Sequence, residues 1–307
     1  MILLKFGAQI LNYFNTWEEV LPTIKHIDAG PWSSLMFSDH FLPPYPGANL
    51  EAESALESWT ILTATAAVTE RVRLAVLVTG NVFRNPALLA KMAATIDQIS
   101  NGRLILGIGA GWYKREHEAF GWNFPGVKER CDRLEEAVEL IKMLFTADGP
   151  IDYNGQYYSL KQAYFSPPCT QKPHVPIMVG GNGEKRTLRT LVKFGDIANI
   201  DLNKPGTPEL FRHKLDVIER HCEELGRDPS EIKKTMVTPL RIFDNEKEAA
   251  QYLETRGRKA WLYGTVPNII ERVQQYIDAG AEEIIFSGPS TIEWAEQVED
   301  KIFSAFS

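Results

Sequence analysis

The residues with the clearest capacity for chemistry are an adjacent aspartate and histidine, Asp39 and His40, which directly follow a short apolar run. Histidine titrates near neutral pH, so it suits the transfer of a proton to or from a reacting group. The aspartate would bind a polar edge of a cofactor or orient the histidine. The alternative is that His40 only hydrogen-bonds a nearby loop. We predict Asp39 and His40 as the catalytic residues.

A second apolar run carries glycines at alternate positions, Gly107, Gly109 and Gly111. A glycine has no side chain, so a ligand can approach the backbone closely there. We therefore expect Gly109, Ala110 and Gly111 to contact a cofactor, with tight helix–strand packing as the alternative. The spacing differs from the GxGxxG fingerprint of dinucleotide-binding proteins.

Aromatic and titratable residues follow these glycines at once. Trp112, Glu116 and His117 come next in the chain and are expected to form a wall of the substrate pocket. The alternative for Glu116 is a favourable interaction with the dipole of a helix that begins nearby.

A third apolar run ends in a glycine-rich turn that leads into a helical segment. Free backbone N–H groups at a helix start bind phosphate well. The turn lacks the GxxxxGK[ST] pattern of a P-loop, and an ordinary strand–helix turn is the alternative. The residues predicted to hold the cofactor at this turn are Gly180, Gly181, Asn182 and Gly183. Lys185 or Arg186 would add positive charge.

Other classes of function lack their characteristic residues. No HExxH or similar spacing occurs, no strand ends in a lysine suited to a Schiff base, and no GxSxG appears, so we predict no metal site. The net charge of -7 and the absence of a basic run argue against a nucleic-acid partner. No apolar stretch is long enough for a membrane span, and the N-terminus does not read as a signal peptide, so we expect a cytoplasmic protein.

Strand-like and helix-like patterns alternate along the whole chain. The predicted strands are Leu3–Ile10, Ser34–Phe37, Leu74–Val78, Leu104–Ile108, Ile177–Val179, Ile197–Ile200, Met236–Ile242 and Ile284–Phe286. Helical spacing is clearest over 128–145 and 268–279, and Asn85 and Pro86 are typical of a helix start. Such alternation predicts a parallel sheet, closed into a (β/α)8 TIM barrel, with an open doubly wound sheet as the alternative.

The expected barrel is a single domain over 1–307. The segment 148–176 breaks the alternation because it is rich in proline and tyrosine. We interpret it as an insertion after the fourth helix, either a packed surface excursion or a wall over the active site. Stretches 46–55 and 255–266 are expected to be further loops.

Several of these segments together resemble the luciferase-like monooxygenase class, particularly the branch of coenzyme F420-dependent oxidoreductases. The resemblance runs from about residue 5 to residue 290. The stretches that carry it are Arg84–Lys91, Gly102–Trp112, Arg133–Ala137 and Val179–Arg186.

The resemblance implies that a deazaflavin ring lies at the C-terminal mouth of the barrel, with Asp39 and His40 beside it. It also implies a bulge with a non-proline cis peptide near Val76–Leu77, which would back the ring. Hydride transfer between coenzyme F420 and a small organic substrate is the implied activity. A homodimer is expected because the family often forms one. The sugar-phosphate dehydrogenases of the class carry a glutamate proton donor where this chain has Trp112, so Glu116 and His117 become candidate substitutes.

Other functions stay open on the sequence. The first alternative is a monooxygenase that uses FMN and oxygen with a flavin reductase as partner. The second is a flavin-binding barrel without catalysis, which the retention of Asp39 and His40 disfavours. A phosphate-binding lyase or isomerase barrel is a further alternative, for which no suitable base or lysine is found.

Overall fold

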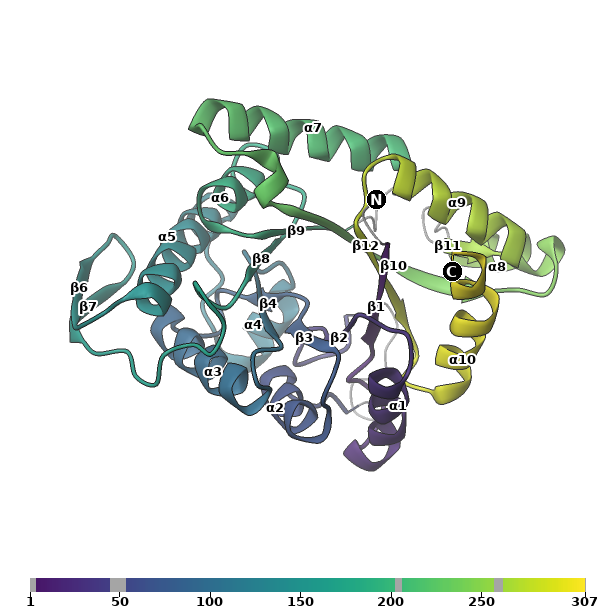
Figure 1. Cartoon of the computed structure of the whole chain (residues 1–307), viewed down its shortest axis with the longest axis horizontal. Helices are drawn as coiled ribbons and strands as arrows, with labels where there is room; N and C mark the ends of the chain where they lie inside the picture. Colours follow the sequence, from purple (N-terminus) through teal and green to yellow (C-terminus); the bar gives the residue numbers. More distant parts are fainter. Residues whose placement is uncertain (1–3, 45–53, 202–205, 257–261, 307) are drawn as a thin grey trace.

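The parallel strands form a closed ring, as the alternating pattern predicts. A computed structural model describes residues 4–44, 54–201, 206–256 and 262–306. In ring order the strands are β1 (Lys5–Ile10), β2 (Ser34–Phe37), β3 (Arg73–Val76), β5 (Leu104–Gly109), β8 (Ile177–Gly180), β9 (Ile197–Asp201), β10 (Lys233–Ile242) and β12 (Glu283–Gly288). The β9–β10 and β12–β1 pairings close the ring, which excludes the open sheet (Figure 1).

Helices surround the ring and cover its outer face (Figure 1). They are α1 (Trp17–Ala29), α2 (Ser58–Val68), α3 (Pro86–Ile99), α5 (Val127–Thr146), α6 (Thr187–Phe194), α7 (Pro208–Leu225), α8 (Glu246–Arg256), α9 (Val266–Asp278) and α10 (Ile292–Lys301). The short helix α4 (Lys114–Phe120) instead follows β5 at the carboxyl end of the strands. Local sequence sets their starts. Thr16 and Glu19 form a capping box on α1, and Asn85 caps α3 with Pro86 in its first turn, as predicted.

Two apolar layers hold the barrel together. The larger one lies between the strands and the helices. The smaller one fills the interior of the ring, with inward-facing side chains at alternate strand positions. Its buried members are Met36, Ala75, Leu77, Ile105, Met178, Ile197, Val237 and Ile285. These side chains therefore fill the space inside the ring. A ligand would bind at the ends of the strands, as is usual for a barrel of this kind.

The third barrel strand is interrupted, so the predicted strand Leu74–Val78 is too long. It ends at Val76, and a short strand β4 (Thr79–Gly80) continues the pairing with β5. The cis peptide lies between Leu77 and Val78, one residue after the expected position. The Val78 side chain turns toward β5 and β8 from this bulge.

The insertion contains an antiparallel hairpin that the sequence did not predict, β6 (Ile151–Asn154) and β7 (Ser159–Ala163). It lies beside α5 on the outside of the helix layer (Figure 1). The Glu136 carboxylate of α5 accepts hydrogen bonds from the backbone of Gln156, Tyr157 and Tyr158. The position of the hairpin on α5 agrees with a packed surface excursion, while Asn81, which follows β4, donates to the Tyr158 hydroxyl and ties the segment to the barrel.

Other differences lie at element ends. β10 begins at Lys233, and β11 (Leu262–Gly264) pairs with β10 inside the expected loop 255–266. Most of the expected loop 46–55 lies outside the described residues. None of the helices in the described ranges has the length and apolar character that crossing a membrane requires.

Candidate functional site

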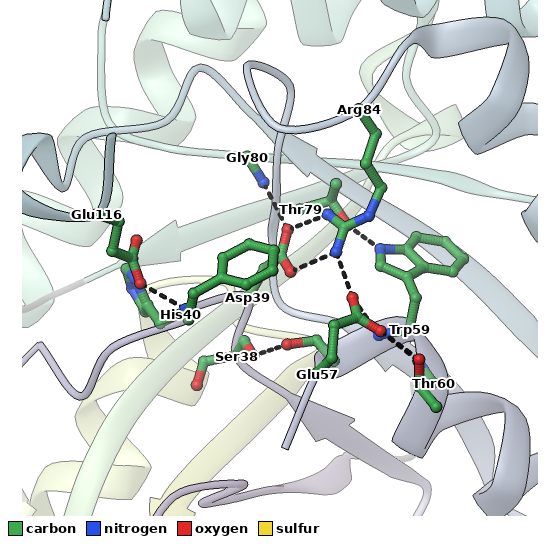
Figure 2. Close-up of polar contacts among 12 residues, drawn as sticks. Ser38, Asp39, His40, Glu57, Trp59, Thr60, Thr79, Gly80, Arg84 and Glu116 are labelled. Atoms are coloured by element: carbon green, nitrogen blue, oxygen red, sulfur yellow. Dashed lines mark hydrogen bonds and ion pairs between the residues drawn. The ribbon is translucent and has the colours of Figure 1, made fainter. Parts of the chain in front are cut away.

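A buried carboxylate holds the predicted catalytic histidine in place. His40 follows β2, and Glu116 lies in the first turn of α4, which follows β5. Glu116 is fully buried, and its Oε2 lies 3.0 Å from His40 Nδ1. Its Oε1 accepts the backbone N–H groups of Phe41 at 2.5 Å and Leu42 at 2.9 Å. One carboxylate therefore fixes both the imidazole and the backbone that carries it (Figure 2).

Two aromatic rings flank His40. The imidazole meets the rings of Trp112 and Tyr113 edge-on, at centroid distances of 5.4 and 5.7 Å. Trp112 keeps 63% of its surface exposed, so it stands at the rim of the mouth. The structure thus brings Trp112 and Glu116 to His40, Trp112 as a flanking ring and Glu116 as a hydrogen-bond partner.

Asp39 is bound by other groups and does not orient His40. Its carboxylate accepts Arg84 Nη1 at 2.7 Å, Arg84 Nη2 at 3.1 Å and the Gly80 N–H at 3.1 Å (Figure 2). Burial raises the pKa of the Asp39 carboxyl, whereas Arg84 and the Gly80 N–H act to lower it. The second expected role, orienting His40, belongs to Glu116 instead.

Arg84 also contacts Glu57, the residue that caps α2. Burial lowers the pKa of the Arg84 guanidinium, but the carboxylates of Asp39 and Glu57 outweigh it and raise the pKa. One buried cation therefore joins β2, α2 and the loop after β4. The contact of Arg84 with Asp39 could not be predicted from sequence, because the two residues are 45 positions apart in the chain.

His117 is not a wall of the mouth, which corrects the expectation from sequence. Its side chain is fully buried, with Nδ1 3.0 Å from the Asn123 carbonyl oxygen. Its ring stacks on Phe83 at 5.0 Å and also contacts Trp122 and Phe124. Burial lowers the pKa of this imidazole. His117 is thus part of an aromatic cluster that supports α4.

The glycines on β5 and β8 leave space for the bulge that follows β3. A Cβ at Gly107 would lie 2.1 Å from the Val76 carbonyl oxygen. At Gly109 and Gly180 a Cβ would approach the Val78 methyl groups to 2.9 and 2.7 Å. These distances are shorter than any real carbon contact, so the glycines make room for Val78. Packing against a neighbouring strand therefore requires glycine at these positions, and their predicted contact with a cofactor stays a prediction.

The turn between β8 and α6 has the features of an anion site. Among the described residues, the backbone N–H groups of 183–187 have no acceptor. Asn182 donates to the Asp201 carbonyl, while its buried Oδ1 has no partner in the described part of the chain. The start of an eight-residue helix with free N–H groups suits a phosphate, and the orphaned Oδ1 suits a hydroxyl group of the same ligand. Arg186 pairs with Asp132 instead of turning toward this site.

Further polar residues around the mouth had no signal in the sequence. Gln9 on β1 donates to the Leu77 carbonyl at 3.2 Å and so braces the bulge. Ser38 hydrogen-bonds the Tyr13 hydroxyl, and its Oγ lies 3.2 Å from Asn12 Oδ1. These contacts fix the backbone just before Asp39.

The model of the luciferase-like monooxygenase family matches residues 1–305 of this chain. The chain belongs to the luciferase-like monooxygenase family. It is an oxidoreductase of this class.

Curated relatives within the family share almost a third of their residues with this chain. An F420-dependent glucose-6-phosphate dehydrogenase of Kineococcus radiotolerans is 31% identical over 293 residues, which is 83% of this chain and 82% of that protein. The enzyme of the same name from Amycolatopsis mediterranei is 28% identical over 296 residues, 83% of this chain and 84% of that protein.

The fold also matches solved structures over nearly its full length. An F420-dependent secondary alcohol dehydrogenase, solved with an F420–acetone adduct, superposes with a TM-score of 0.86 at 20% identity. The match covers 99% of each chain. At this identity the likeness supports the fold of this luciferase-like chain and says nothing of its substrate.

Proposed function

We propose that this protein transfers a hydride between coenzyme F420 and a small organic substrate. The observation that carries the proposal is the buried Glu116–His40 pair at the barrel mouth, 3.0 Å apart and flanked by aromatic rings. The relatives named as F420-dependent dehydrogenases support the cofactor. When bound, the deazaflavin supplies the hydride carrier, and the protein supplies orientation and proton transfer.

The described residues fit such a cofactor at two places. The free N–H groups at the start of α6, with Gly181 and Gly183, would hold its phosphate. The bulge at Leu77–Val78, braced by Gln9, would back its ring. Asp39, held by Arg84, keeps the end of β2 against this bulge through the Gly80 N–H.

His40 is the residue that moves a proton in this proposal. Its Nδ1 faces Glu116 Oε2, while Glu116 Oε1 is occupied by two backbone N–H groups. A carboxylate only accepts hydrogen bonds, so the imidazole proton lies on Nδ1 and the exchanging atom is Nε2. In substrate reduction, His40 would act as the imidazolium and give its Nε2 proton to the substrate oxygen as hydride arrives, which leaves the neutral ring with its proton on Nδ1. In the reverse direction, the bare Nε2 of the neutral ring would take the proton from the substrate hydroxyl.

Titration of the purified protein with coenzyme F420, and separately with FMN, tests the cofactor. We expect tight binding of the deazaflavin and much weaker binding of FMN. A preference for FMN would move the protein to oxygen chemistry with a flavin reductase. Binding of neither cofactor would refute the proposal.

Replacement of His40 tests the role in catalysis. We expect His40→Ala to reduce kcat by about 10²–10⁴-fold, the usual contribution of a general acid–base group, with little change in F420 affinity. A His40→Ala protein that folds, binds F420 and turns over at the original rate would exclude His40 as the proton carrier.

A further inference from the structure

A cavity opens beside the mouth where two barrel strands part. β10 pairs with β12 as far as Pro239 and Ser287, and beyond that point β10 pairs with β11 instead. Proline has no N–H to continue the ladder, so the strands separate at Pro239. The space between them has a volume of about 760 Å³, which is within the usual range for a small-molecule site.

The cavity lies at the catalytic end of the barrel. Leu11 follows β1 and Gly288 ends β12, so both lining residues stand at the carboxyl ends of strands. His40 follows β2, and the ring order β10, β12, β1, β2 places one strand, β1, between the cavity and His40. The cavity and His40 therefore lie at the same end of the barrel, on strands separated only by β1 in the ring.

Most of the cavity wall is apolar or aromatic. The lining residues of this kind are Leu11, Pro239, Leu240, Ile242, Tyr263 and Pro289. Tyr252 also lines the cavity and packs edge-on against Tyr263 at 5.6 Å. Such walls favour a ligand with a ring-containing or otherwise apolar body.

One buried donor in the wall has no acceptor. Trp294 is 7% exposed, and among the described residues its Nε1 has no hydrogen-bond partner. The nitrogen lies against Gly288, where a Cβ would be only 2.5 Å from it. Both residues line the cavity. A buried N–H without an acceptor is uncommon, and here it calls for an oxygen on a ligand.

The charged residues in the wall are Arg241 and Glu293. The Arg241 guanidinium lies over the rings of Tyr252 at 4.5 Å and Phe243 at 5.4 Å. Within the described ranges it forms no ion pair with a carboxylate, so its charge is available to a ligand oxygen. Glu293 is exposed at the start of α10, at the solvent side.

We propose that this cavity binds the organic substrate, and that the substrate has an apolar, ring-sized body with a carbonyl or carboxylate oxygen that accepts from Trp294 Nε1. The proposal rests on the proposed function for the reaction that follows binding. The binding itself needs no cofactor, so the two can be tested apart.

The test uses ¹⁵N-indole-labelled protein without cofactor and four probes: 2-acetylnaphthalene, 2-naphthoate, naphthalene and glucose 6-phosphate. The Trp294 resonance is assigned from its absence in Trp294→Phe. We expect both oxygen-bearing naphthalenes to shift this resonance, and naphthalene to leave it in place. Trp294→Phe should bind these two probes about tenfold more weakly, the effect of one lost hydrogen bond, and Trp17→Phe on α1 should bind them as the original protein does.

Arg241→Gln separates the two oxygen chemistries. A selective loss of 2-naphthoate binding would assign a carboxylate, and unchanged binding of both probes would assign a carbonyl. Unaltered binding by Trp294→Phe, or a Trp294 shift with glucose 6-phosphate alone, would overturn the proposal. If F420 fails to bind while the Trp294 shift persists, the hydride-transfer function is lost and the ligand site remains.

Discussion

At the scale of single residues, Glu116 determines which nitrogen of His40 is available. Its two oxygens are shared between the imidazole Nδ1 and two backbone N–H groups, and the side chain is fully buried. A neutral amide at this position can offer only one oxygen and would place an NH₂ group against one of these donors. The imidazole would then lose its fixed orientation.

We therefore expect Glu116→Gln to reduce kcat by on the order of 10–100-fold, as loss of an orienting partner does, while the Kd for F420 stays close to the original. Steady-state kinetics and cofactor titration measure the two effects. Glu118→Gln is the matched control, because Glu118 is exposed on the same helix and forms an ion pair with Lys114 on the surface.

The tautomer of His40 distinguishes an orienting role of Glu116 from a purely structural one. ¹⁵N NMR of the histidines reports which ring nitrogen carries the proton, and we expect the Nδ1–H tautomer of His40 to lose its dominance in Glu116→Gln. An unchanged tautomer together with unchanged kcat would show that Glu116 only supports the loop at 41–42.

Arg84 is the cation between two carboxylates, and its removal leaves Asp39 buried without its partner. We expect Arg84→Met to lower the free energy of unfolding by about 3–5 kcal/mol, the usual cost of breaking a buried ion pair. Urea denaturation measures it. Arg189→Met, which removes a surface pair with Glu224, should change the same quantity by less than about 1 kcal/mol.

The sequence identified Asp39 and His40 from residue type and position at a strand end, but not their partners. Glu116 is 76 residues from His40 in the chain, and Arg84 is 45 residues from Asp39. Spacing carries no information over such distances, because only closure of the barrel brings these side chains together. The structure places Glu116 beside His40 and His117 in a buried aromatic cluster, although the two are adjacent in the chain.

At the scale of elements, the bulge after β3 and the glycines of β5 depend on each other. Gly107→Ala would force a methyl group to within 2.1 Å of the Val76 carbonyl oxygen, which is backbone and cannot swing away. We expect this substitution to cost about 1–3 kcal/mol of unfolding free energy, as overpacking does. Gly149→Ala, at a position with open space, should have little effect. Equal stability of the two variants in urea would contradict the packing argument.

Element types were predictable and several element ends were not. Buried parallel strands give continuous apolar runs, which is why Ser34–Phe37 was predicted to the residue. A continuous apolar run does not reveal a bulge within it. The predicted strand Leu74–Val78 therefore continues two residues beyond Val76, where the observed strand ends. The β6–β7 hairpin has half-exposed strands without an apolar pattern, and β11 has only three residues.

At the scale of the whole molecule, the end of the barrel opposite the site is closed by a buried polar cluster. Glu283 on β12 accepts from the hydroxyls of Ser33 and Ser34 and pairs with Lys233 on β10. Burial raises the pKa of Glu283, but Lys233 and the two hydroxyls outweigh burial and hold the pKa below its usual 4.5. This carboxylate on β12 therefore joins β10 to the start of β2.

Because the folded-state pKa is depressed, the contribution of Glu283 is complete above pH 4.5 and is lost as the pH falls through the folded value. We expect Glu283→Gln to be less stable than the original protein by on the order of 2 kcal/mol at neutral pH. The difference should shrink as the pH falls below 4.5, because the carboxylate then becomes protonated in the folded protein as well. Urea unfolding at several pH values measures it, and a difference that grows on acidification would reverse the sign argued here.

The parting of β10 and β12 at Pro239 has a consequence for how this barrel can be diversified. The turn proposed to hold phosphate and the His40–Glu116 pair belong to the arc from β2 to α6, whereas the cavity proposed to bind substrate belongs to the arc from β10 to β1. Random libraries confined to 239–243, 252, 263 and 287–297 would therefore change the substrate cavity without changing the His40–Glu116 pair. A variant selected for a new substrate would then carry its substitutions on the arc from β10 to β1. The residues proposed for hydride and proton transfer, on the arc from β2 to α6, would be the original ones.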